Sequence, residues 1–162
     1  MQQLQSYEEM SFKEELWNAI THGAGFLISI PVTVLLIIHA SSMNSPVHIV
    51  TFSIFGSSVI LLFLMSTLLH SMPVKYKRFF AILDHSSIYI LIAGTYTPFL
   101  LIAIGGALGI TLLCIIWSIA LFGVVFKCYF IDRFETFSLA LYIAMGWMIV
   151  FAIKPVYAYL QV

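Results

Sequence analysis

The sequence predicts an all-α protein, a polytopic transmembrane helix bundle with five full spans and the start of a sixth. Hydrophobic residues fill 62% of the 162 positions and charged residues only 9%, and the mean hydropathy is +1.06. A soluble domain carries roughly 25% charged residues, so an ordinary soluble globule is excluded. A helix needs about 20 mainly apolar residues to cross a membrane. Five stretches are long enough, approximately Leu16–His39, His48–His70, Phe80–Ile104, Ala107–Phe126 and Phe134–Ile153.

The segments between these spans are short and rich in turn-forming or charged residues. In chain order they read SSMNSP, SMPVKYKR, GG and KCYFID, and connections of this kind make consecutive helices antiparallel neighbours. After Ile153 the run KPVYAYLQV begins another apolar segment and stops too soon to span. A partial span would leave backbone groups unsatisfied, so we expect a chain without its last helices rather than a five-span protein with an apolar tail.

The basic residues predict the orientation of the bundle. Six of the seven Lys and Arg residues fall on one side of the predicted spans, which places the N-terminus and the second and fourth loops in the cytoplasm. We therefore expect residues 1–15 to be a cytoplasmic segment and residues 16–162 to form a transmembrane helical domain in the cell membrane. The six basic residues on the cytoplasmic side are Lys13, Lys75, Lys77, Arg78, Lys127 and Arg133, and Lys154 falls on the opposite side.

The net charge of the chain gives no reason to expect a nucleic-acid partner, because seven acidic residues balance the seven basic ones.

Polar side chains occur at the cytoplasmic ends of the second and third spans. Ser66 and His70 are four residues apart, which puts them on one face of a helix. Asp84, followed directly by His85, stands near the start of the third span, and a short turn brings it to the depth of His70. Ionisable groups in a span are costly and so are candidates for a site. The simpler alternative is a boundary carboxylate that reaches water and a serine that bonds its own helix backbone.

The first span carries a polar stripe at the same depth. Glu15, Asn18 and His22 are spaced i, i+3 and i+7, so they project from one face of a helix. Polar stripes on membrane helices usually face the interior of a bundle. Three consecutive helices thus present polar groups on the same side, and the sequence favours one buried polar site over independent residues reaching for water.

Three motifs carry a resemblance to a known family. They are E-x-x-N-x-x-T-H from Glu15 to His22, S-x-x-x-H from Ser66 to His70, and the run DHSSIYILIAGTYTP from Asp84 to Pro98. Together they resemble the hemolysin III family, which is similar to the progestin and adipoQ receptors and to a wider set of seven-helix proteins regarded as metal-dependent lipid hydrolases. The resemblance covers the chain through the fifth predicted span and implies a bacterial plasma membrane.

The resemblance also implies a zinc site. In the wider set it is built from a second-span Ser and His, a third-span Asp and an H-x-x-x-H pair in the seventh span. Carried over, His70 is a zinc ligand, Asp84 orients the attacking water and Ser66 supports the site. Glu15, Asn18, His22 and His85 are expected around it, where they would contact the ligands rather than the metal. This sequence has no sixth or seventh span and no H-x-x-x-H pair, so zinc is expected for a full-length family member rather than for this chain alone.

Three functions fit these observations. The first is a zinc-dependent hydrolase of a lipid amide or ester, with the membrane lipid as substrate. The second is a pore-forming, cytolytic protein, although the outer halves of the spans lack the polar stripe that a conduction path needs. The third is a receptor-like protein that senses lipid and uses a metal only for structure. Self-association into a homo-oligomer is compatible with all three.

Overall fold

The computed structural model describes residues 12–131 and 133–150, and the described part of the chain is helical throughout, with no strand. Five α-helices and one π-helix follow each other with short connections. The elements are α2 (Phe12–Ser42), α3 (Pro46–Ser71), α4 (Val74–Pro98), the π-helix η1 (Phe99–Ile104), α5 (Gly106–Phe130) and α6 (Glu135–Trp147).

Among the described residues, four helical segments are long and apolar enough to cross a membrane. They are α2, α3, the continuous segment Val74–Ile104 and α5, and they coincide with the first four predicted spans. The fifth predicted span is not confirmed, because α6 has 13 residues, fewer than the roughly 20 that a crossing needs. The end of that predicted span, residues 151–153, and the predicted start of a sixth, residues 154–162, lie outside the described residues.

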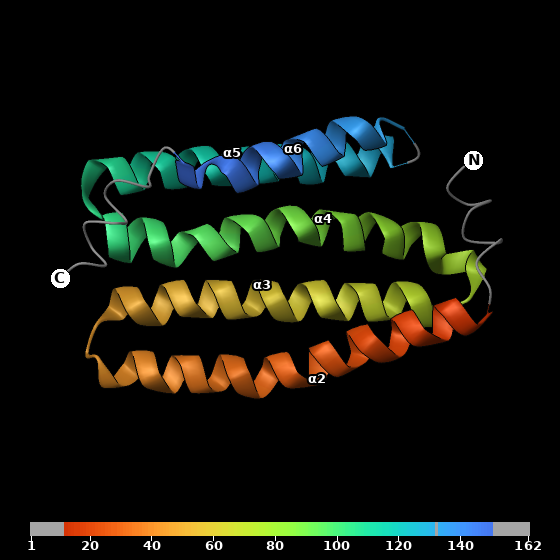
Figure 1. Ribbon diagram of the computed structural model, residues 1–162, viewed down its shortest axis with the longest axis horizontal. Coiled ribbons are helices and arrows are strands. Elements are labelled where there is room, and N and C mark those ends of the chain that lie inside the picture. The colour runs from red at the N-terminus through yellow and green to blue at the C-terminus, as the bar shows by residue number, and fades with distance from the viewer. Residues whose placement is uncertain (1–11, 132, 151–162) are drawn as a thin grey trace.

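Consecutive helices lie side by side and antiparallel. In Figure 1, α2, α3, α4 and α5 follow one another across the bundle, and α6 packs against α4 and α5. One end of the bundle therefore gathers the start of α2, the end of α3, the start of α4 and the end of α5 (Figure 1, right). We call it the charged end, because Lys13, Lys77, Lys127 and Glu15 belong to it, and we call the opposite end the far end.

The connection between α3 and α4 is shorter than predicted. The segment Ser71–Phe79 was expected to be a loop, but α3 continues to Ser71 and α4 begins at Val74. Pro73 explains the early start, because its fixed φ suits the residue that precedes or opens a helix and its missing N–H is not needed there. Lys75, Lys77 and Arg78 consequently lie on the first two turns of α4 rather than in a loop.

The α-helical part of the segment Val74–Ile104 ends at Pro98. Proline cannot donate a backbone hydrogen bond to the preceding turn, and at this residue α4 passes into the π-helix η1. The hydrogen bond at the end of η1 runs from the Gly105 N–H to the Leu100 carbonyl five residues earlier, at 3.0 Å. Gly105 and Gly106 then adopt φ values of +62° and +58°, which glycine tolerates without strain, and the chain reverses into α5 as the GG pair predicts.

Small residues let the helices approach closely. A Cβ atom added to Gly123 of α5 would lie 2.4 Å from the ring of Tyr89 on α4, and one added to Gly56 of α3 would lie 2.3 Å from Thr33 of α2. Close approach through glycine is typical of membrane helices, whose association depends on packing rather than on the hydrophobic effect. Many large apolar side chains are exposed on the surface of the bundle, as expected for residues that face lipid.

Replacing Gly123 by alanine is expected to destabilise the bundle by about 1–3 kcal/mol, because an added methyl group in a packed interface forces its neighbours to move. The Tyr89 ring is fully buried and lies 4.4 Å from the ring of Tyr142, centroid to centroid, so it has little room to shift. Unfolding of the purified protein in detergent micelles would measure the change. Gly146→Ala is the matched control, because its added Cβ meets nothing within 4 Å; an equal loss in both variants would contradict the packing argument.

Candidate active site at the charged end

Three helices bring ionisable side chains together at the charged end. Glu15 of α2 contacts His70 of α3, with 3.1 Å between Oε2 and Nδ1, and its other oxygen, Oε1, accepts a hydrogen bond from the ammonium group of Lys77 on α4. The side chains of Glu15, His70 and Lys77 are only 13%, 11% and 6% exposed. Charges this far from water need a partner of opposite sign, so the carboxylate of Glu15 links α2 to both α3 and α4.

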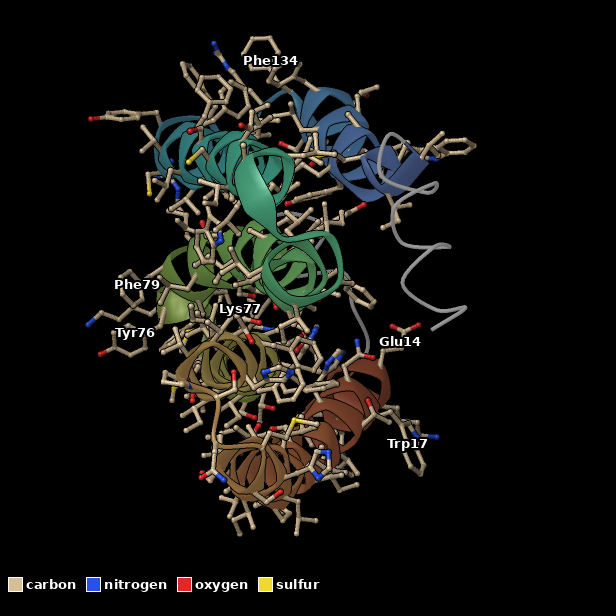
Figure 2. The ribbon with its side chains drawn as sticks, turned by 90° about the vertical axis from the view of Figure 1, so that its left-hand side faces the viewer. Glu14, Trp17, Tyr76, Lys77, Phe79 and Phe134 are labelled. Atoms are coloured by element: carbon tan, nitrogen blue, oxygen red, sulfur yellow. The ribbon has the colours of Figure 1, made fainter. Side chains whose placement is uncertain are left out.

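The side-chain view places Lys77 inside the bundle. Figure 2 shows Lys77 between α3 and α4, whereas its neighbours Tyr76 and Phe79 project outward from α4 and Trp17 projects outward from α2. Exposure agrees with the view, since Tyr76, Phe79 and Trp17 are all exposed and Lys77 is buried. The inward direction of Lys77 is therefore a property of one face of α4.

His22 extends the cluster by one more ring. Its imidazole stacks on that of His70, with 6.0 Å between ring centroids and 18° between the planes, and it lies equally far from the ring of Phe63. The Nδ1 atom of His22 is buried and has no hydrogen-bond partner among the described residues. A buried polar atom of this kind is normally satisfied by water, an ion or a ligand, so His22 marks the side of the cluster where a further group fits.

Two other predicted residues lie beside the cluster. Ser66 is buried at 5% exposure, one helical turn before His70 on the same face of α3. Asn18 is half-buried on α2, between Glu15 and His22 in the sequence. The stripe predicted on the first span therefore points toward α3 rather than toward lipid.

Asp84 and His85 form a separate pair further along α4. The Asp84 carboxylate lies 3.9 Å from Nδ1 of His85, whose N–H donates to the Ala81 carbonyl at 2.7 Å. The Tyr142 hydroxyl of α6 donates to the His85 carbonyl at 2.9 Å, which ties α6 to this part of α4. Within the described residues, no hydrogen bond or ion pair joins Asp84 to His70 or Ser66, so their convergence on one site stays a prediction. Glu15 is the carboxylate that the structure places beside His70.

Sequence reasoning missed Lys77 and Tyr142 as parts of these groups. Lys77 was assigned to a loop by its charge, but it stands seven residues before Asp84, the spacing of one stripe on a helix. Its inward direction could have been inferred once α4 was extended back to Pro73. Tyr142 carried no such signal, because its contact is with a backbone carbonyl of another helix.

The residue types at the charged end suit a zinc site, but too few of the described residues are placed together to complete one. With Nδ1 of His70 donating to Glu15, the lone pair of the ring is on Nε2. Histidines that bind metals commonly donate their other ring N–H to a carboxylate in this way. A catalytic zinc commonly has three protein ligands. Among residues 12–131 and 133–150, no group of three or more His, Cys, Asp or Glu side chains is placed to hold a metal ion. His70 is a suitable ligand, and a complete site needs at least two ligands beyond it.

Comparison with known proteins agrees with the arrangement of motifs. A family model described as "Haemolysin-III related" matches residues 10–162. Hemolysin-3 of Bacillus cereus is 56% identical over 146 residues, which cover 90% of this chain and 67% of that protein. The Hemolysin-3 homolog of Bacillus subtilis (strain 168) is 56% identical over 152 residues, which cover 93% of this chain and 71% of that protein. The chain therefore belongs to the haemolysin III-related family of membrane proteins.

Proposed function

We propose that this protein is a membrane-embedded hydrolase of a lipid amide or ester, with its site at the charged end of the bundle and that end facing the cytoplasm. The observation that carries the proposal is the buried contact between Glu15 and His70, extended by Lys77 and His22. Ionisable groups buried in a membrane protein are expensive and usually functional. A histidine oriented by a carboxylate is also the common form of a general base or a metal ligand.

Each residue of the cluster has a distinct proposed task. Glu15 accepts the Nδ1 hydrogen of His70 and so leaves the Nε2 lone pair for the reaction, while Lys77 fixes the second oxygen of Glu15. Nε2 can take a proton from a water molecule as the water oxygen attacks the carbonyl carbon of the lipid. The C–N or C–O bond then breaks, and the proton passes to the leaving amine or alcohol.

The remaining predicted residues support that chemistry. Asp84 would orient the attacking water, and Ser66, Asn18, His22 and His85 would surround the reacting groups. Zinc, when bound, supplies Lewis-acid activation of water. His70 is the residue of this chain that would hold it, through Nε2, with further ligands from His22, His85, water or another chain. Nε2 would then be unable to accept a proton, and Asp84 would take the proton of the attacking water instead.

The experiment for this proposal measures lipid cleavage and metal content in the same preparations. Vesicles containing the purified protein are supplied with an amide-linked and an ester-linked acyl lipid, and the released acid is quantified by mass spectrometry. We expect release from at least one lipid class, and less zinc in His70→Ala than in the wild type. His39→Ala, on an exposed residue at the far end of α2, is the matched control. If neither lipid class releases acid, the hydrolase proposal is wrong. If the wild type, His70→Ala and His39→Ala all contain near-zero zinc, zinc has no part in the proposal.

Membrane lysis is the second candidate, because both relatives described above are named hemolysins. The same vesicles loaded with a fluorescent dye distinguish the two candidates. A hydrolase leaves the dye inside until lipid is cleaved, so leakage should fall with His70→Ala. Rapid leakage that persists in a variant carrying both His70→Ala and Asp84→Asn would favour a pore that needs no catalytic residues.

The proposed orientation predicts which introduced cysteines react from outside the cell. The native Cys114 and Cys128 are both exposed, so they are first replaced by serine. A cysteine at Asn44, in the α2–α3 connection, should then react with an impermeant thiol reagent added to intact cells, and one at Lys75 should react only after lysis. The reverse pattern would place the charged end outside and overturn the sidedness of the site.

A further inference from the structure

A partly open cavity lies at the far end of the bundle, away from the candidate active site. Its volume is about 450 Å³, and it is lined by α2, α3 and the segment in which α4 passes into η1. Side chains that line it include Leu36, His48, Phe52, Phe55, Thr95 and Phe99. Cavities of 300–1,000 Å³ with apolar walls and a few polar groups are the usual form of a site for a small molecule.

The lining of the cavity suits an elongated apolar ligand with one polar end. Phe52, Phe55 and Phe99 supply apolar surface. Thr95 offers little to a ligand, because its hydroxyl already donates to the Leu91 carbonyl at 2.8 Å. His48 is the remaining polar side chain of the lining, and it lies in the first turn of α3, beside the connection from α2.

His48 is held in a way that leaves one ring nitrogen for a ligand. Its Nδ1 lies 2.8 Å from the Ser45 hydroxyl. When that hydroxyl donates to Nδ1, the ring hydrogen is on Nε2 and can be donated to an oxygen atom of a ligand. His48 and Phe55 are two helical turns apart, so the apolar wall extends roughly 10 Å from the polar end along α3.

The π-helix that follows Pro98 lies at this cavity. Phe99, Ile102 and Ala103 of η1 all contribute to the lining, so the departure from α-helical geometry forms one wall of the cavity. Such π-segments are rare, are less favourable than a continuous α-helix and occur frequently at functional sites.

From these observations we infer that the far-end cavity binds the acyl chain of a single-chain lipid, with the oxygen atoms of the lipid head at His48. The volume suits one small ligand, and the bilayer around α2, α3 and α4 is the source of such chains. The inference rests on the cavity alone and does not depend on the proposed hydrolysis.

The test uses a long-chain fatty acid that carries a diazirine on its chain. The purified protein in vesicles is irradiated with this probe, and labelled residues are mapped by mass spectrometry with and without an excess of plain fatty acid. Labelling should concentrate on Phe52, Phe55 and Phe99 and should be competed away. Labelling that is not competed, or that spreads evenly over the exposed faces of the helices, would overturn the inference.

Matched variants separate binding from folding. Ala103→Trp fills the cavity and should reduce the competed labelling about tenfold or more, whereas Ala107→Trp, on an exposed position of α5, should not. His48→Ala should weaken competition by the fatty acid about tenfold, the usual size of a lost hydrogen bond to a charged group. His39→Ala is its control. Undiminished competed labelling in Ala103→Trp would refute the site, and unchanged competition by the fatty acid in His48→Ala would refute the placement of the lipid head at His48. Competed labelling from the same diazirine on a diacyl phospholipid, but not from the fatty acid, would refute the single-chain ligand.

Discussion

Replacing Glu15 by glutamine is expected to lower the free energy of unfolding by on the order of 3 kcal/mol, because the buried charge of Lys77 then loses the carboxylate of a buried ion pair. Lys77 is 6% exposed on its side chain and would lose the carboxylate that it contacts. The contact to His70 would weaken as well, since a neutral amide replaces the carboxylate. Chemical unfolding of the protein in detergent micelles would measure the change.

A double-mutant cycle provides the control for this prediction. Lys77→Met alone should also destabilise the protein, but Glu15→Gln together with Lys77→Met should lose much less than the sum of the two, because no buried charge is then left uncompensated. Lys75→Met, on the exposed side of the same helix, should change stability by no more than about 0.5 kcal/mol. Additive losses in the cycle would show that Glu15 and Lys77 do not stabilise each other.

Removing the imidazole of His70 is expected to lower kcat/KM for the cleaved lipid by about 100- to 10,000-fold, the usual loss when a general acid or base is deleted. The effect should be mainly on kcat, because His70 is proposed to act on the water and not to bind the acyl chain. Initial rates over a range of lipid mole fractions in vesicles would separate kcat from KM.

His39→Ala serves as the control for that measurement, since it removes an imidazole from the opposite end of the protein. The secondary structure and unfolding of His70→Ala should be recorded with its activity, because His70 also contacts Glu15. A folded His70→Ala protein that cleaves lipid at the wild-type rate would exclude His70 from the reaction.

The four spans could be predicted because length and composition alone decide them. Charge and hydropathy place most boundaries within four residues, the start of α4 being six residues earlier than predicted, and the GG turn follows from the conformational freedom of glycine. The fourth loop was harder: it was expected to begin at Lys127, but α5 continues through Phe130, because tyrosine, phenylalanine and the charged residues at the membrane surface are compatible with helix.

The rotation of each helix about its axis could not be predicted with equal certainty. A membrane helix such as α3 or α5 is apolar on all sides, so no hydrophobic stripe tells which face is inward. For this reason the sequence did not show that Glu15, rather than Asp84, lies beside His70. Lys77 was missed for a related reason, since the positive-inside rule treats every lysine as a marker of a loop, although a lysine on the first turns of a helix can turn inward when a carboxylate meets it.

The most direct test of the central claim, that Glu15 and His70 act together as one catalytic site, is the lipid-cleavage rate of Glu15→Gln, His70→Ala and the double variant. Residues that act as a unit show losses that do not add. The claim therefore predicts that Glu15→Gln lowers the rate strongly in the wild-type background and changes it little once His70 is alanine. Equal factors of loss in the two backgrounds, or a Glu15→Gln variant as active as the wild type, would contradict it.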